Sequence, residues 1–410
     1  MRTRIAAFPC LCTAPCWTPS SPVIRPPRAQ RWKSTSTTPS SAGPEPAASP
    51  RAERPGRRRR AGRIPRPTPL KPRPDDREEH LRLHTIALAL AATVAGLAST
   101  GGTALAQTYS FRAAHYFKEE HPWNKGLAYF ADRAKEESKG RIQIDIFNGG
   151  MLGSEAQTLQ FVKDGSLDFV VADPSAGSPF AKELDFFALP FLFRDYAHWQ
   201  ASLDGEPGKS YAQTIEAKTG MKILGYWGGS SRNVLSTKKP VTNIDDMKGF
   251  RLRLVSSPLK VNVWKAVGAA PTPIAFMETY LAMKSGVVDG MENESVSVRD
   301  MKFYEPAPYI ARTEHEFTVR PLFMSKKSFD KLPADLQQIV LKAAQEATAY
   351  ERKAEAEANE AAEAEMANKL NVKFNAIDKA PFKAATKPVI AEFASSMGLS
   401  DLLKTIDAIQ

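Results

Sequence analysis

The chain has 410 residues, and its 56 Lys and Arg against 45 Asp and Glu give a formal net charge of +11. Residues 1–106 hold 18 of the basic and 6 of the acidic residues, which leaves 38 basic and 39 acidic residues in the remainder. The positive charge belongs to this N-terminal extension, so charge-driven nucleic-acid binding by the rest of the chain is disfavoured. No apolar run reaches the roughly 18 residues of a membrane span, so the mature chain is not expected to insert directly into a membrane.

All three cysteines, Cys10, Cys12 and Cys16, lie in the same extension, together with 16 of the 31 prolines. A cysteine-free body excludes thiol catalysis, zinc–thiolate sites and a disulfide scaffold. A body of about 300 residues can bury a large core, and two lobes are the simplest division for that length.

The first 80 residues are rich in Pro and Arg, with the run Arg57–Arg60 and few periodic apolar positions. Such a segment cannot bury enough surface to offset its ordering entropy, so residues 1–80 are predicted to be disordered. A misplaced start codon explains them most simply, with Leu81 as an alternative start. Two other interpretations stay open: an organellar transit peptide, or a twin-arginine signal at Arg57–Arg60.

Residues 81–106 have the layout of a secretion signal. Arg82 and His84 precede the apolar stretch Thr85–Ser99, and an A-x-A pattern ends at Ala106. Cleavage after Ala106 would begin the mature chain at Gln107. The sequence therefore predicts a periplasmic protein.

From Gln107 onward, β-like and helical patterns alternate, which favours an α/β fold with largely parallel sheets. The expected strands are Ser110–Ala114, Arg141–Phe147, Leu167–Ala172, Met221–Trp227, Arg251–Val255 and Val287–Met291. The expected helices are Pro122–Ser138, Glu155–Lys163 with Ser154 as N-cap, Pro258–Val267 and Phe276–Ser285.

The segment Asp335–Leu370 is dense in Ala, Glu and Lys, the strongest helix formers, and predicts one long helix within residues 333–371. Its apolar positions other than Ala are too sparse for a coiled coil, so a half-solvated helix packed along the domain is expected. Residues 372–410 are expected to form a C-terminal helical segment.

Motifs for catalysis are absent from the body. Its four histidines, His115, His121, His198 and His315, show no metal-ligand spacing, and no P-loop, G-x-G-x-x-G or G-x-S-x-G motif occurs. We therefore expect no catalytic residue, no metal site and no cofactor.

Arg251 and Arg253 stand two apart on an expected strand, so their side chains share one face. A guanidinium holds a small carboxylate best, because its planar fork donates two parallel charge-assisted hydrogen bonds. From the pattern alone, a ligand clamp and a structural ion pair are equally supported for Arg253.

Several motifs follow in order between Tyr226 and Tyr304. They are G-x-x-R-N with Arg232, K-G-x-R-x-R with Arg253, P-T-P-I-A-F-x-E-x-Y at 271–280 and G-V-V-D-G-x-E-N at 286–293. This block resembles the signature of the periplasmic solute-binding proteins of TRAP transporters (tripartite ATP-independent, DctP-like family). The resemblance covers residues 108–345.

The resemblance implies a two-lobed periplasmic binding protein fold (type II-like), with the long C-terminal helix bracing both lobes. Lobe I would comprise residues 107–231 with a return near 318–345, and lobe II residues 232–317. The chain would cross between the lobes near Arg232 and near Glu316–Val319.

The resemblance also implies site residues. Arg253 would be the carboxylate clamp and Arg232 the family's second arginine at the crossing. The Asn293 amide would contact the ligand, Phe276 would close over it, and Glu155 would read its hydroxyls. For Arg232, Phe276 and Glu155, a hinge ion pair, core packing and a helix-dipole charge are the competing structural interpretations.

Four further residues, Trp227, Trp123, His115 and Asp173, are candidates for the wall contributed by the first lobe. Glu294 departs from the Asn or Pro that often follows Glu-Asn in sugar-acid binders. An additional carboxylate there would repel a dianion or recognise hydroxyls or an amine, so it bears on the identity of the ligand.

The function expected from the resemblance is the substrate-binding subunit of a TRAP-type secondary transporter. It would capture a small organic acid, a sugar acid or a C4-dicarboxylate-like ligand, and deliver it to membrane permease subunits driven by an ion gradient. The alternatives are the binding protein of an ATP-driven importer or of a chemosensory system, and an enzyme acting on a carboxylic acid.

Overall fold

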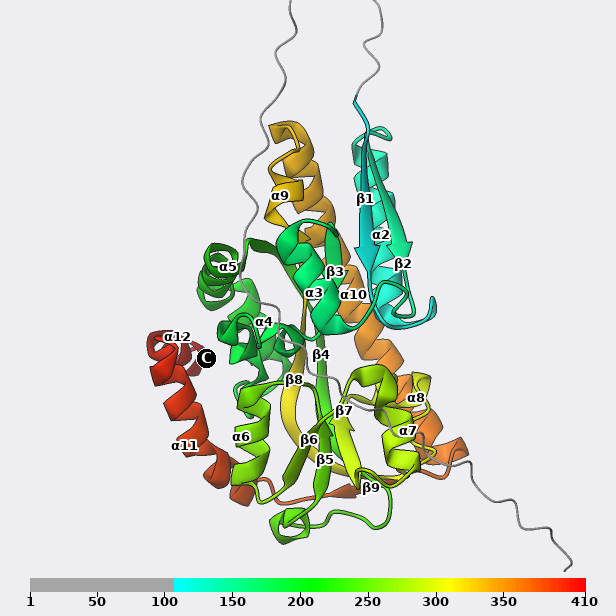
Figure 1. Cartoon of the computed structure of the whole chain (residues 1–410), viewed down its shortest axis with the longest axis vertical. Helices are drawn as coiled ribbons and strands as arrows, with labels where there is room; N and C mark the ends of the chain where they lie inside the picture. The colour runs from blue at the N-terminus through cyan, green and yellow to red at the C-terminus, as the bar shows by residue number, and fades with distance from the viewer. Residues whose placement is uncertain (1–106) are drawn as a thin grey trace, which may run out of the picture. The chain divides into compact units, whose positions relative to one another are not determined.

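The computed structural model describes residues 107–410; the predicted extension and the predicted cleavage after Ala106 lie outside the described residues. Figure 1 shows a mixed α/β architecture. The strands are β1 (Tyr109–Ala114), β2 (Ile142–Phe147), β3 (Phe169–Val171), β4 (Met221–Ser236), β5 (Arg251–Leu254), β6 (Ala270–Pro273), β7 (Gly290–Asn293), β8 (Tyr309–Ser325) and β9 (Lys373–Ala376). The α-helices are α2 (Pro122–Glu137), α3 (Glu155–Asp164), α4 (Tyr196–Asp204), α5 (Glu206–Thr219), α6 (Pro258–Ala266), α7 (Thr279–Lys284), α8 (Ser295–Asp300), α9 (Lys326–Phe329), α10 (Ala334–Lys369), α11 (Ala380–Ser396) and α12 (Ser400–Asp407).

The described strands form one sheet in the order β2-β1-β3-β8-β4-β7-β5-β6, with β9 beside β8. Parallel pairs occur at both ends, β1 with β2 and β3, and β5 with β6 and β7. The centre is antiparallel, because β8 pairs with β3 and β4, and β4 with β7. The largely parallel sheet expected from the alternating pattern is thus found only at the two ends of this order and in the added pair of β8 with β9.

Strands β4 and β8 are the longest in the described chain and link the two lobes through their shared ladder. Their register shifts between Gly228 and Ser231 and again between Arg232 and Val234. Gly228 and Gly229 adopt φ angles of +96° and +106°, which L side chains rarely allow. An irregular ladder that contains two such glycines is a place where a paired ribbon can bend.

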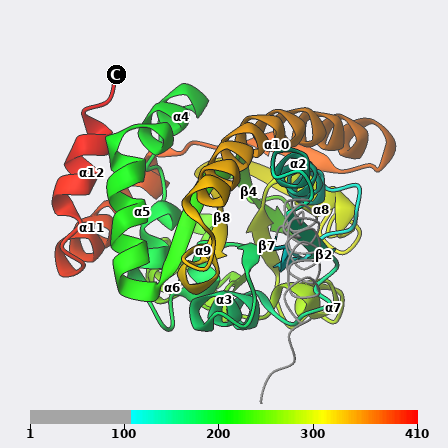
Figure 2. The same cartoon turned by 90° about the horizontal axis from the view of Figure 1, so that it is seen from above.

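Helix α10 runs along both lobes, as Figures 1 and 2 show. It packs against α2 of the first lobe, against β4 at the crossing and against α8 of the second lobe. Its buried residues include the small side chains of Ala343, Ala344 and Ala347, which let the helix approach closely. The expected bracing helix is therefore present.

Local sequence signals place the elements that carry the polar residues between the lobes. Ser154 caps α3 and forms a capping box with Gln157, so Glu155 becomes the first helical residue. Ser257 caps α6, and its hydroxyl also donates to Asp185 Oδ1 at 2.8 Å. This last bond joins α6 of the second lobe to the 3₁₀ helix η2 (Lys182–Ala188) of the first lobe, so the two lobes are in contact.

Candidate functional site

A polar cavity lies between the lobes beside the β4 crossing. Residues of both lobes and of the shared strands line it: Phe117, Trp123, Glu155, Asp173, Arg232, Arg253, Val255, Phe276, Glu292, Asn293, Glu294 and Arg320. Its volume is about 30 Å³, which is room for about two water molecules. A ligand of sugar size does not fit into this space as it stands.

Seven of the nine residues predicted for the site line this cavity. They come from separate elements: Glu155 and Asp173 from the first lobe, Arg232 from β4, and Arg253, Phe276, Asn293 and Glu294 from the second lobe. Trp123, the further candidate for the wall, lines it as well. The cavity lining therefore brings together residues up to 203 positions apart in the sequence, Phe117 and Arg320.

Arg253 on β5 is buried, and its guanidinium donates only through Nε, to the carbonyl oxygen of Ile274 at 2.9 Å. No carboxylate oxygen of residues 107–410 lies within 4.0 Å of it, and its charged end lies 5.7 Å from the centre of the Phe276 ring. Burial lowers the pKa of Arg253 to about 10, so it remains a cation at neutral pH. A buried cation without a carboxylate partner is prepared for an anion from outside.

Arg251, two residues earlier, has a different environment. It is partly exposed and forms a two-pronged pair with Asp289, in which Nη2 lies 2.7 Å from Oδ1 and Nε 2.9 Å from Oδ2. It does not line the cavity. Of the two arginines on this strand, only Arg253 faces the cavity and lacks a partner.

Arg232 is fully engaged with protein acceptors, in contrast to Arg253. Its Nε donates to Glu292 Oε2 at 2.5 Å, its Nη1 to Glu294 Oε2 at 3.0 Å, and its Nη2 to the Glu292 carbonyl at 3.0 Å. Burial alone would lower its pKa, but Glu292, Glu316 and Glu294 raise the pKa of Arg232 well above its usual value. Arg232 thus holds the crossing together by a buried ion-pair network.

Glu294 belongs to the same network. One oxygen accepts from Arg232, the other from the Ser297 hydroxyl, and Arg320 Nη2 lies 3.8 Å away. Its neighbour Asn293 has a buried side-chain oxygen without a hydrogen-bond partner. An unpartnered acceptor at a cavity wall is available to a ligand hydroxyl.

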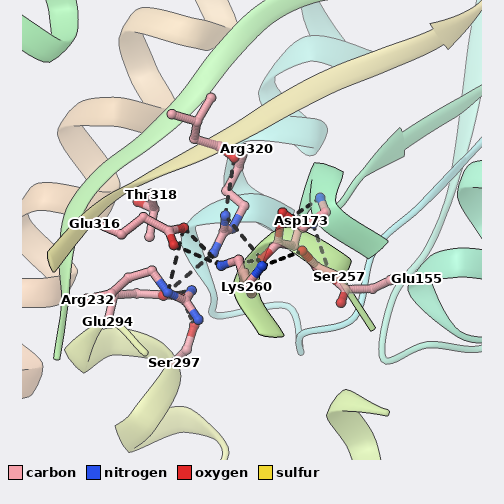
Figure 3. Close-up of polar contacts among 12 residues, drawn as sticks. Glu155, Asp173, Arg232, Ser257, Lys260, Glu294, Ser297, Glu316, Thr318 and Arg320 are labelled. Carbon is pink, nitrogen blue, oxygen red and sulfur yellow. Dashed lines mark hydrogen bonds and ion pairs between the residues drawn. The ribbon is translucent and has the colours of Figure 1, made fainter. Parts of the chain in front are cut away.

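Glu155 and Asp173 form an acidic edge of the cavity on the first lobe (Figure 3). The backbone N–H of Asp173 donates to Glu155 Oε1 at 3.2 Å. Burial and the nearby charge of Asp173 raise the pKa of Glu155 to about 7. Burial would also raise the pKa of Asp173, but Lys260, Arg320 and Arg232 hold it well below its usual range. The two carboxyls therefore differ in protonation below pH 7.

Aromatic rings bound the cavity on its apolar side. The rings of Phe276 and Phe117 meet edge to face at 5.6 Å, and this contact again joins the second lobe to the first. Trp123 packs edge to face on Phe117 at 4.8 Å, and the Arg320 guanidinium lies 5.8 Å from the Trp123 ring. Phe276 is therefore both a cavity wall and part of the core.

Trp227 and His115 lie outside the cavity lining, in contrast to the sequence expectation. Trp227 is fully buried between β4 and α10, and its Nε1 donates to Thr348 Oγ1 at 3.1 Å. The Nε2 atom of His115 lies 3.0 Å from Asn124 Oδ1. Burial lowers the pKa of His115 to about 4. Both side chains serve the packing of the first lobe.

Sequence reasoning missed Arg320, Glu292, Phe117 and Val255, which also line the cavity. It also missed Lys260 of α6, whose Nζ binds Glu316 Oε2 at 2.8 Å behind the cavity. A signal was present: the stretch EHEFTVRPLFM at 314–324 carries four ionisable residues inside an otherwise apolar run. Such residues in a buried strand are kept only where partners or a ligand compensate them.

One group of the described residues, Glu292, His315 and Glu316, has ligand atoms close enough to hold a metal ion. However, Arg232 Nε and Lys260 Nζ already lie 2.5 Å and 2.8 Å from oxygens of Glu292 and Glu316. Two cations at the coordinating oxygens make this an ion-pair network, whose chemistry does not suit a metal ion.

Two lobes joined by a glycine-containing crossing, with a charged cavity between them, are the arrangement of a solute-binding protein. The family model of the bacterial extracellular solute-binding proteins, family 7 (DctP), matches residues 113–396, and the chain belongs to this family. Among the described residues, no helix combines the length and apolar character needed to cross a membrane.

Individual relatives agree with this assignment. A solute-binding protein of Sulfitobacter sp. strain NAS-14.1 is 39% identical over 319 residues, 77% of this chain and 96% of the relative. A TRAP periplasmic solute-binding protein of the same organism, solved with bound α-D-taluronate, is 37% identical with a TM-score of 0.70, over 73% of this chain and 97% of the other. A TRAP periplasmic solute-binding protein from Xanthobacter autotrophicus was solved with bound β-D-galacturonate. It is 32% identical with a TM-score of 0.70, and the match covers 73% of this chain and 100% of the other. The predicted family, the fold class and a binding rather than an enzymatic role are confirmed.

Proposed function

We propose that this protein captures a sugar acid with a single carboxylate between its two lobes, and that Arg253 binds that carboxylate. The observation that carries the proposal is the environment of Arg253: a buried guanidinium on the cavity wall with one backbone acceptor and no carboxylate within 4.0 Å among residues 107–410. A carboxylate ligand would complete its fork with two charge-assisted hydrogen bonds.

The charges around the cavity favour a monoanion over a dianion. The other basic groups, Arg232, Lys260 and Arg320, each lie within 4.0 Å of at least one carboxylate oxygen of the protein. A second ligand carboxylate would therefore meet Asp173, Glu292 or Glu294 without a free cation to balance it, and like charges in a buried site repel strongly. This argues for a sugar acid and against a C4-dicarboxylate.

The remaining polar groups suit hydroxyls. The Asn293 side-chain oxygen is an acceptor without a partner, and the Glu155 carboxyl has an oxygen that accepts only from the Asp173 backbone. Relatives of 37% and 32% identity were solved with uronic acids, which combine one carboxylate with several hydroxyls. Both observations support a uronate-like ligand.

The proposed mechanism is hinge closure. The lobes touch through the Ser257–Asp185 hydrogen bond and the Phe276–Phe117 contact, and the space between them is about 30 Å³. Binding then requires an open form, and a ligand that contacts Arg253 on one lobe and Glu155 on the other favours closure by its differential affinity. The closed form would deliver the acid to the membrane permease of a TRAP transporter, from the periplasm.

The test is isothermal titration calorimetry of residues 107–410 with D-galacturonate, D-glucuronate and succinate. We expect the uronates to bind more tightly than succinate, and Arg253→Ala to weaken uronate binding at least a hundredfold, because a charged hydrogen-bonded anchor contributes roughly 3 kcal/mol or more.

Arg251→Ala is the matched control, since it removes an arginine of the same strand that is paired outside the cavity. The affinity of Arg251→Ala for the uronates should stay within about twofold of the wild-type affinity. Undiminished binding in Arg253→Ala would contradict the proposal.

A further inference from the structure

Arg320 of β8 is a third arginine on the cavity wall, and it is buried at 3% exposure. Figure 3 shows its side chain reaching from the strand shared by the two lobes into the cluster of charged groups near Asp173 and Lys260. It therefore lines the same cavity as Arg253, but from a different strand.

The hydrogen-bond donors of Arg320 are poorly satisfied. Its Nε is buried and has no acceptor, and its Nη1 reaches only the adjacent Val319 carbonyl, at 3.2 Å. The nearest carboxylate oxygens are those of Asp173, 3.7 Å from Nη1, and Glu294, 3.8 Å from Nη2, beyond good hydrogen-bond distance. Arg232, equally buried, donates from all three nitrogens within 3.0 Å. Buried donors without acceptors are costly, so the contrast indicates an acceptor from outside.

The acceptor that suits Arg320 is a neutral oxygen. Asp173 and Glu294 lie close enough to compensate its positive charge, although they do not take up its donors. The unpartnered acceptor of Asn293 lines the same cavity. A hydroxyl can accept from one group and donate to another at once, so it complements both residues.

We propose that Arg320 is a specificity-determining residue that donates to a hydroxyl or ring oxygen of the sugar acid. This inference rests on the proposed function, in which Arg253 holds the carboxylate. Arg253 makes the protein bind acids, and Arg320 makes it prefer polyhydroxylated acids over plain carboxylates of the same size.

The experiment compares two probes by isothermal titration calorimetry: D-galacturonate, and tetrahydropyran-2-carboxylate, which has the same ring and carboxylate but no hydroxyls. In the wild type we expect D-galacturonate to bind at least tenfold more tightly. Arg320→Gln and Arg320→Lys should each weaken D-galacturonate tenfold or more, and leave tetrahydropyran-2-carboxylate within about threefold. Arg253→Ala should weaken both probes together.

Arg320→Lys keeps a positive charge beside Asp173 and Glu294, so it should stay folded even if Arg320→Gln does not. The melting temperature of each ligand-free variant shows whether that variant is folded. Equal losses for both probes, or no loss for either, would overturn the role of Arg320. Tight binding of succinate that Arg320→Gln abolishes would also overturn it, because Arg320 would then be holding a second carboxylate. A wild type that binds neither ring acid would instead remove the proposed function, and the inference with it.

Discussion

Individual residues in the cavity divide between those already satisfied by the protein and those left open. Arg232 and Glu294 are satisfied, whereas Arg253, Arg320 and Asn293 are not. The sequence could single out Arg253 only through the family resemblance, because the strand pattern alone supported a ligand clamp and a structural ion pair equally. The charged stretch at 314–324 could not by itself assign Arg320 to the site, because its place on the cavity wall depends on β8 lying between β3 and β4, pairings that span more than 70 residues.

Glu155 makes ligand binding depend on pH. Its pKa is raised to about 7, first by burial and then by Asp173. A ligand carboxylate nearby would raise this pKa further, so the complex would take up a proton above pH 7 and affinity would fall as pH rises. A further rise of about one pKa unit corresponds to tenfold weaker binding of D-galacturonate at pH 9 than at pH 6. Calorimetry between pH 6 and pH 9 measures the affinity, and its repetition in buffers of different ionisation enthalpy measures the proton uptake on binding.

Glu155→Gln is the matching variant, because its side chain cannot ionise. Its affinity for D-galacturonate should be nearly constant between pH 6 and pH 9. Arg253 does not confound the comparison, because its pKa of about 10 keeps it charged through most of the range. Tighter binding of D-galacturonate at pH 9 than at pH 6 would contradict this pH dependence, because it would mean that a hydroxyl bond to ionised Glu155 outweighs the repulsion by the ligand carboxylate.

Among the elements, helix α10 shows how much local sequence determines. It was expected at 335–370 and spans Ala334–Lys369, because its composition specifies a helix without help from tertiary contacts. β8 was not expected as a strand, since its charged residues disguise it until β4 and the cavity partners are in place. The antiparallel centre of the sheet was not predicted either, because it is made by pairing between strands that are far apart in the sequence.

Helix α10 also presents a buried acid pair to the hinge. Glu351 Oε2 accepts from the Gly228 N–H at 3.0 Å, and Glu355 Oε1 accepts from the Thr318 hydroxyl at 3.1 Å. Burial, and then the neighbouring carboxyl, raises the pKa of Glu351 well above its usual value. A carboxyl with a raised pKa in the fold stabilises it fully below the unfolded-state pKa, and this contribution is lost as pH rises toward the folded-state pKa.

We therefore expect Glu351→Gln to increase the free energy of unfolding at pH 8 by about 1–2 kcal/mol, with little change at pH 4. The amide keeps an acceptor for Gly228 and gains a donor toward Glu355. Urea denaturation at both pH values measures the difference. Glu357→Gln, at an exposed position of the same helix, should leave both values unchanged. A loss of stability at pH 8 in Glu351→Gln would mean that the buried charge is required there.

For the whole molecule, the narrow interlobe space implies a change of shape on binding. A cavity of about 30 Å³ cannot admit a hexuronic acid, so the proposed mechanism requires the lobes to open before binding. The bend is expected at Gly228 and Gly229, where the ladder of β4 and β8 is irregular. Small-angle X-ray scattering of residues 107–410 should show a smaller radius of gyration with D-galacturonate than without it.

The same closure should stabilise the molecule against unfolding. At a free ligand concentration 100 times the dissociation constant, D-galacturonate should add about 2.7 kcal/mol to the free energy of unfolding. Arg253→Ala should show neither the compaction nor the stabilisation at that concentration, whereas Arg251→Ala should show both, because its pair with Asp289 lies outside the cavity. Stabilisation without compaction would mean that the acid binds to a form that is already closed, and the hinge would have no part in capture.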